Sequence, residues 1–228
     1  MNIPSFLLHR PAFDKTPEMT AAFDNLYKST APGEFINYSL PYPKWQFLSY
    51  LCEAHDLVLH GSQNPDIQVV EPRQAKDTKT FSNQRAIYAT TDGIWVQYFA
   101  ILDRKNYPEL TLFNSCMQAR LSVDQWSEPS YFFSITYSVL LQKPWCPGAI
   151  YILPRQTFLQ EPAQNWGEVE IVFPHWISTQ AAQPVAKLRV ESQDFPYLAQ
   201  IHGHNNQKLV RMASENPRGF PWLDALES

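Results

Sequence analysis

Apolar residues recur at helical spacing near both ends of the chain and once near its middle. The segments with this spacing are 16–30, 43–55, 92–102 and 205–216. Thr16 is suited to cap the first of them, and Pro17 is suited to its first helical position. Pro217 ends the last one, because proline cannot continue a helix. The pattern therefore predicts four helices.

From Leu57 onward, most apolar residues form the short runs that are typical of strands. The expected strands are 57–60, 86–90, 110–114, 131–141, 148–153, 168–173 and 184–191. Pro147 and Gly148 form a turn signal that predicts a hairpin between two of these strands. We expect a single α+β domain over 1–228. Its parts are a helical lead-in (1–56), a β-rich core (57–190), and a C-terminal tail with a helix (191–228).

Composition narrows the classes of function. The net charge of −4, with scattered Lys and Arg, makes nucleic acid a less favoured partner, because such binding needs a basic face. The apolar N-terminus lacks the basic region of a signal peptide, and no run reaches the length of a membrane span. A cytoplasmic protein without membrane contact is expected. The 7 glycines form neither a GxGxxG nor a GxxxxGK loop.

Cysteine and histidine spacing gives no metal signal. The three cysteines include no CxxC pair, which argues against a disulfide framework and a structural zinc site. The step 202-HGH-204 has no cysteine or carboxylate ligand at useful spacing, so we expect no metal there.

The stretch 59-LHGS-62 ends a predicted buried strand and is the first candidate for chemistry. His60 can offer one ring nitrogen to a ligand while the other is held by backbone. Gly61 lets the backbone approach a planar ligand closely, and Ser62 adds a hydroxyl group. The alternative is ordinary packing of His60 at the strand end, with Gly61 in a turn.

A second candidate lies in 86-AIYATTDGIWVQYFAIL-102, where a strand with Tyr88 leads into a helix with Tyr98. Two aromatic rings from such elements suit a flat heteroaromatic ring between them. For the other helix aromatics, Trp95 and Phe99, ordinary core packing is the favoured interpretation.

These two pieces together resemble the ADP-ribosyltransferase superfamily, in particular the branch of the poly(ADP-ribose) polymerases and diphtheria-type toxins. The matches are His60-Gly61-Ser62, then Ile87-Tyr88-Ala89, and then Tyr98. The resemblance implies a split antiparallel β-core with flanking helices, and NAD as a substrate bound between the halves. By resemblance, His60 holds the adenine-side ribose or orients NAD. Gly61 and Ser62 bond the nicotinamide carboxamide, and Tyr88 and Tyr98 enclose the nicotinamide ring.

The chain departs from the family at the third motif, a strand that carries a catalytic glutamate. In 173-FPHWISTQAAQPVAKLRV-190, His175 occupies that position, and it cannot supply a fixed negative charge. Glu168 and Glu170, expected on one face of a strand, are the alternative carboxylates. The Gln156 amide and the Glu161 carboxylate are weaker candidates. Arg73 is a candidate for contact with the pyrophosphate.

The resemblance thus predicts transfer of ADP-ribose from NAD to an unknown acceptor, as a mono-ADP-ribosyltransferase or an NAD glycohydrolase. An alternative is a non-catalytic module that binds NAD or ADP-ribose and has lost the glutamate. A third hypothesis is that the chain is an interaction or structural protein that has kept only the fold.

Overall fold

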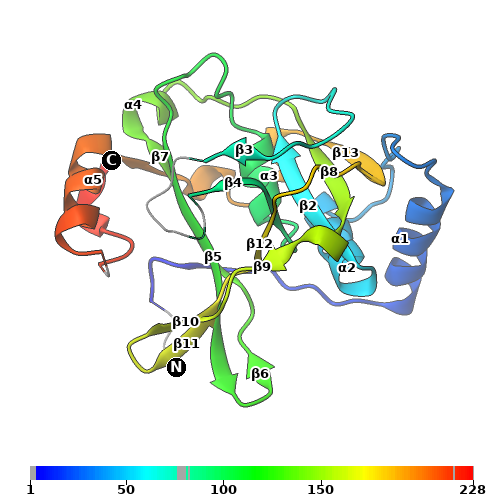
Figure 1. The fold of residues 1–228 in the computed structure, drawn as a ribbon, viewed down its shortest axis with the longest axis horizontal. Coiled ribbons are helices and arrows are strands. Elements are labelled where there is room, and N and C mark those ends of the chain that lie inside the picture. Colours follow the sequence, from blue (N-terminus) through cyan, green and yellow to red (C-terminus); the bar gives the residue numbers. More distant parts are fainter. Residues whose placement is uncertain (1–3, 76–80, 82, 218, 228) are drawn as a thin grey trace.

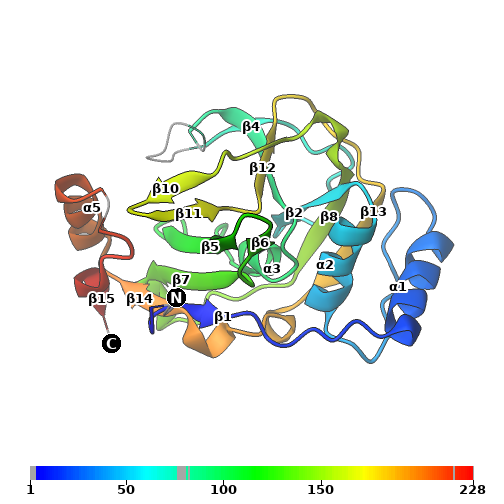
Figure 2. The same cartoon turned by 90° about the horizontal axis from the view of Figure 1, so that it is seen from below.

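The protein is described by a computed structural model that covers residues 4–75, 81, 83–217 and 219–227. Two β-sheets form its centre, and helices lie at both ends (Figure 1). Helices α1 (Pro17–Ser29) and α2 (Lys44–Ala54) lie together at one end, while α5 (Asn206–Glu215) lies at the other, as Figure 2 also shows. Within the described ranges, no helix combines the length and apolar character needed to cross a bilayer.

The first sheet is antiparallel except where β14 runs parallel to β7. Its strand order is β10 (Gln164–Trp166), β11 (Val169–Val172), β5 (Leu112–Ser122), β7 (Ser130–Thr136), β14 (His202–His204) and β15 (Leu226–Glu227). Two further short strands, β1 (Leu8–His9) and β6 (Gln125–Trp126), pair with β7 and β5 respectively.

The second sheet is antiparallel throughout. Its strand order is β13 (Ala186–Val190), β8 (Gly148–Pro154), β2 (Leu57–Ser62), β4 (Arg85–Thr90), β12 (His175–Ser178) and β9 (Leu159–Gln160), with β3 (Arg73–Gln74) also paired to β4. This order makes neighbours of the three strands that carry His60, Tyr88 and His175.

Apolar side chains bury both faces of the central strands in each sheet. The largest core lies between the sheets and includes Leu59 and Ile150 from the second sheet and Phe133 from the first. Smaller cores cover the outer faces, around Tyr151 on the second sheet and Phe132 on the first. Burial on both faces explains why β7 and β8 are nearly continuous apolar runs rather than alternating ones.

The short helix α3 (Trp95–Ala100) packs on β2, β4 and β8 of the second sheet and hydrogen-bonds to β5 and β7 of the first. The carboxylate of buried Asp92 accepts hydrogen bonds from the backbone N–H groups of Ile94 and Trp95, which satisfies donors at the helix start. The Tyr98 hydroxyl donates to the carbonyl of Ser134 on β7, at 2.9 Å. The helix therefore ties the second sheet, on which it packs, to the first.

The predicted α+β class and all four helices are confirmed. The expected strand over 131–141 is wrong in its second half, because the chain leaves the sheet after Thr136 and forms α4 (Tyr137–Leu140), of which only Val139 is buried. The predicted hairpin at Pro147 is also wrong, since β7 and β8 belong to different sheets. The strand expected over 110–114 instead extends to Ser122.

Candidate functional site

His60 lies where strands β2 and β4 separate. The two strands pair only at Leu59 and Thr90, and the His60 ring bridges the gap beyond this pair. Its Nδ1 lies 2.8 Å from the Tyr88 carbonyl oxygen, which can only accept, so Nδ1 carries the proton. In a neutral imidazole, this leaves Nε2 as an acceptor, and none of the described residues bonds it.

Burial keeps His60 neutral. Desolvation is the main cause that lowers the pKa of His60, and the charges of Arg104 and Arg73 lower it further, against the hydrogen bond to Tyr88. Arg73 itself is exposed on β3, opposite Ala86 of β4. A cationic side chain therefore lies near the split between the strands, on the solvent side.

Gly61 and Ser62 both have local structural roles. A Cβ atom on Gly61 would lie 2.5 Å from the carbonyl oxygen of Val96, so the glycine allows α3 to pack directly on β2. The Ser62 hydroxyl accepts a hydrogen bond from the Asn64 N–H at 3.2 Å, which stabilises the turn after the strand. The close approach required of Gly61 is therefore to a helix, and this contact alone accounts for the glycine.

The Tyr88 hydroxyl is held by local backbone. It donates to the Gln84 carbonyl at 2.6 Å and accepts from the Gln84 N–H at 3.1 Å. The Tyr88 ring stacks on His175, with 5.8 Å between centroids and 22° between planes. Because β4 and β12 are paired, with Ile177 opposite Tyr88, this stacking is a cross-strand contact.

His175 is hydrogen-bonded to a buried carboxylate. Its Nδ1 donates to Glu161 Oε2 at 2.8 Å, and the other oxygen of Glu161 accepts from the Gln164 amide at 2.6 Å. The Glu161 side chain is 3% exposed and that of His175 is 14% exposed. Both carboxylate oxygens are thus used, and His175 retains Nε2 as the nitrogen without a described partner.

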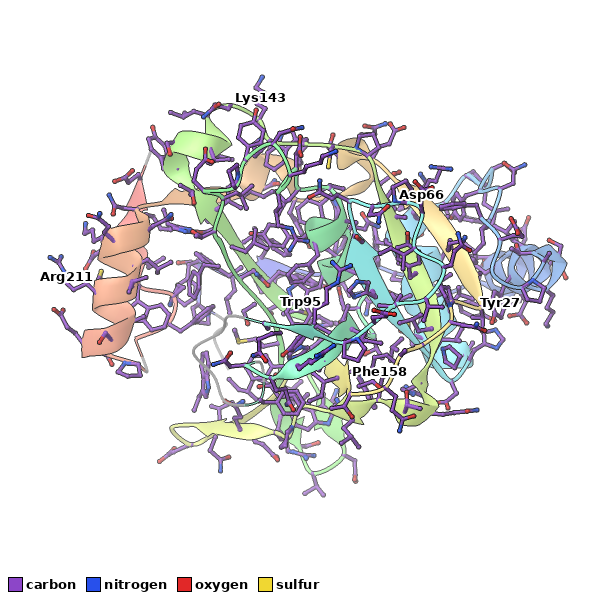
Figure 3. All side chains as sticks on the ribbon, turned by 45° about the horizontal axis from the view of Figure 1, so that its top comes forward. Tyr27, Asp66, Trp95, Lys143, Phe158 and Arg211 are labelled. Carbon is purple, nitrogen blue, oxygen red and sulfur yellow. The ribbon has the colours of Figure 1, made fainter. Side chains whose placement is uncertain are left out.

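Three aromatic rings surround His175. Besides Tyr88, Trp95 and Phe81 meet it edge-on, at 5.9 and 5.5 Å between centroids. The Trp95 indole N–H donates to Asn114 on β5 of the first sheet, and Figure 3 shows Trp95 near the middle of the molecule. We call this group the His175 cluster: Glu161, Gln164, His175, Tyr88, Trp95 and Phe81.

The helix aromatic beside Gly61 is Phe99, and Tyr98 faces the core. Tyr98 is fully buried and packs on Phe133 at 4.9 Å between ring centroids. Among the described ring contacts, none joins Tyr98 to Tyr88. Phe99 is half-buried, and its Cβ lies 3.4 Å from where a Cβ of Gly61 would stand. The prediction that Tyr98 encloses a ligand with Tyr88 therefore does not fit this geometry.

The two alternative carboxylates lie elsewhere. Glu168 is exposed in the turn between β10 and β11, not in a strand as predicted, and Glu170 is ion-paired with Arg120 of β5. The carboxylate that is hydrogen-bonded to His175 is instead Glu161, which the sequence analysis named as a weaker candidate. It follows β9, and only the pairing of β9 with β12 brings it to His175.

The chemistry of the site therefore comes from two imidazoles, each with its Nδ1 hydrogen-bonded, and from the aromatic rings beside them. Within the part of the chain that the structure describes, no three His, Cys, Asp or Glu side chains gather as a metal site. Two surface hollows border α5 at the far end of the molecule, and neither is lined by residues of the His175 cluster. No protein-family model, curated protein sequence or solved structure matches this chain.

Proposed function

We propose that the protein binds NAD in the manner of the ADP-ribosyltransferases and transfers ADP-ribose from it to an acceptor. The observation that supports this most is the order β2–β4–β12, which makes neighbours of the strands that carry His60, Tyr88 and His175. The separation of β2 from β4 after Leu59 agrees with the split antiparallel β-core that the resemblance implies.

In this proposal, His60 Nε2 accepts a hydrogen bond from a ribose hydroxyl group of NAD. The nicotinamide ring stacks on Tyr88, on the ring face that His175 leaves uncovered. Phe99 takes the part that the sequence assigned to Tyr98, because it is the half-buried aromatic of α3 beside Gly61. The backbone of Gly61 bonds the carboxamide, with the Ser62 hydroxyl near it.

The remaining side chains meet the charged parts of the substrate. Arg73, exposed on β3, meets the pyrophosphate. At the position of the family's glutamate, the Glu161 carboxylate is hydrogen-bonded to His175 at 2.8 Å and supplies the negative charge of the site through that contact. Such a charge favours the oxocarbenium-like transition state that forms when nicotinamide leaves.

Release of nicotinamide from NAD tests this proposal. We expect turnover by the wild-type protein and a fall of about 10²–10⁴-fold in His175→Gln, which is the usual contribution of a positioned acid–base group. We expect His60→Ala to lose at least about tenfold in affinity for NAD, equal to about 1.4 kcal/mol. His202→Gln, which changes an exposed histidine of the other sheet, is the matched control.

The same experiment separates the competing functions. Binding of NAD without turnover would favour the non-catalytic module, a reading supported by the histidine at the glutamate position. If neither NAD nor ADP-ribose shifts the melting temperature at millimolar concentration, the proposal fails and an interaction or structural role remains.

A further inference from the structure

We infer that His175, held by Glu161, accepts a proton from a hydroxyl nucleophile, so that the acceptor of ADP-ribose is water or an alcohol rather than a carboxylate. This inference rests on the proposed function and names the acceptor class of that same site. Its basis is the geometry of the His175 cluster.

The position of the proton on His175 is fixed by Glu161. A carboxylate accepts only, so the 2.8 Å contact to Oε2 places the imidazole proton on Nδ1 and leaves the Nε2 lone pair for another group. Stacking on Tyr88 and edge contacts with Trp95 and Phe81 hold the plane of the ring. His175 therefore presents a basic nitrogen in one orientation.

Glu161 is placed to act through His175 and not directly on substrate. Its side chain is 3% exposed, and its two oxygens are already occupied by His175 and Gln164. A buried carboxylate in this position stabilises the imidazolium that forms when Nε2 takes a proton. Glu161 is thus a positioning residue for His175.

The need for a base identifies the acceptor class. A carboxylate acceptor is already ionised at neutral pH and attacks without losing a proton. A hydroxyl group must lose its proton as it attacks, and an imidazole with a free Nε2 is the common group for that task. A base held this firmly is therefore useful for a hydroxyl acceptor and is not required by a carboxylate.

The proposed reaction moves ADP-ribose from nicotinamide to a hydroxyl oxygen. The bond between the ribose anomeric carbon and the nicotinamide nitrogen breaks, and its electron pair leaves with nicotinamide. The hydroxyl oxygen bonds to the anomeric carbon, and its proton passes to His175 Nε2. The imidazolium then returns this proton to solvent, so NAD and ROH give the O-linked ADP-ribosyl product, nicotinamide and one proton.

Product analysis distinguishes the acceptors. The full chain is incubated with NAD alone, with NAD in methanol–water, and with NAD and acetate. The products are then separated by chromatography and identified by mass spectrometry. We expect free ADP-ribose in the first case and additional O-methyl ADP-ribose in the second. Any ADP-ribose on the chain itself should resist neutral hydroxylamine, which cleaves ester links to carboxylates but not O-glycosidic links.

Ester products would overturn the inference while leaving the proposed function intact. These are an acetyl ester in the third incubation, or hydroxylamine-labile ADP-ribose on the chain, in place of hydroxyl products. Absence of nicotinamide release in all three incubations would overturn both proposals, so the two failures are distinguishable.

The role of Glu161 has its own readout. In ¹⁵N-labelled protein, the ring nitrogens of His175 are assigned by their loss in His175→Gln, and we expect the proton on Nδ1 without NAD present. Glu161→Gln should lower nicotinamide release by about 10²-fold or more, while Glu161→Asp, which keeps the charge, should retain more activity. Glu128→Gln, at an exposed glutamate, is the control.

A proton found on Nε2 would overturn the assignment whatever the activity. So would wild-type turnover in Glu161→Gln that folds normally by circular dichroism. If Glu161→Gln does not fold, Glu161→Asp is compared with the wild type instead. A loss of turnover in Glu161→Asp as large as that in His175→Gln would then overturn the assignment.

Discussion

Two histidine clusters, one on each sheet, differ in how many ring nitrogens the protein uses. In the His175 cluster, Nδ1 is bonded to Glu161 and no described residue bonds Nε2. In the other, which we call the His204 cluster (His204, Ser134, Thr111, Thr136 and Asn206), Nδ1 meets the Ser134 hydroxyl and Nε2 lies 3.0 Å from the Thr111 hydroxyl.

The difference separates a structural histidine from a candidate site. His204 is 1% exposed and both of its nitrogens have partners, so it has nothing left to offer a ligand. His175 is half-buried and has only Nδ1 hydrogen-bonded, so Nε2 has no described partner and stays available to a ligand. A histidine paired with a hydroxyl or carboxyl group is therefore a candidate site residue only if its second ring nitrogen has no partner within the protein.

The largest expected effect concerns the pH dependence of stability. Burial lowers the pKa of His204 to about 4, from 6.5 in an exposed histidine. The unfolded chain therefore binds the proton first as pH falls, and the folded state loses stability between about pH 6.5 and 4. At about 1.4 kcal/mol for each pH unit, this amounts to about 3 kcal/mol.

Urea unfolding of the wild type and His204→Gln across this pH range measures that loss. The stability difference between the two proteins at pH 7 should shrink or reverse by pH 4, because the variant lacks the titrating group. Parallel curves would mean that His204 has the same pKa in the folded and the unfolded protein, and the contrast between the clusters would fail.

Several helices and strands could be predicted because the sequence signals for them, such as caps and apolar runs, are local. Thr16 accepts from the Met19 N–H as an N-cap should, and Pro17 occupies the first turn of α1. The motif strands were also recognised, since His60 and Tyr88 each stand in a short apolar run. For these elements, the local sequence pattern was enough to predict that they exist and whether they are helices or strands.

The partners within the site could not be predicted, because they depend on long-range pairing. Glu161 meets His175 only because β9 pairs with β12, and no spacing in the sequence signals that pairing. The choice between Tyr98 and Phe99 depends on the rotation of a six-residue helix between two sheets. Adjacent aromatic residues give no information on that rotation.

A second prediction compares the two His-Gly steps, in which each glycine lies under a helix. A Cβ on Gly61 would meet the backbone oxygen of Val96 at 2.5 Å, whereas one on Gly203 would meet the Tyr137 side chain at 2.3 Å. The backbone of a packed helix cannot swing away from Gly61. At Gly203 the half-buried Tyr137 ring can turn, and the remaining contacts, with the Tyr137 Cα and Cβ, are looser at 3.1 Å. We expect Gly61→Ala to cost about 3 kcal/mol and Gly203→Ala about 1 kcal/mol.

Denaturant unfolding without ligand gives both values. Equal losses would show that the ring of Tyr137 is as fixed as the backbone of α3. A neutral Gly61→Ala would remove the packing explanation of that glycine and leave ligand contact as the reason for it.

The smallest expected effect lies on the helix that joins the clusters. α3 supplies Trp95 to the His175 cluster, and its Tyr98 bonds the carbonyl of Ser134, a member of the His204 cluster. Between them, Gln97 is fully buried, and both of its amide atoms lack a partner among the described residues. Burying an amide without hydrogen bonds is unfavourable. Gln97 therefore differs from the polar side chains of the two clusters, each of which has at least one described hydrogen-bond partner.

Gln97→Met keeps a similar volume and removes the unsatisfied amide, and we expect it to stabilise the protein by about 1 kcal/mol in urea unfolding. Gln164→Met is the contrasting variant, because the Gln164 amide donates to Glu161 and its loss should destabilise. If Gln97→Met destabilises as well, the Gln97 amide has a hydrogen-bonding partner in solution. The helix between the clusters would then carry a third satisfied polar position rather than an unsatisfied one.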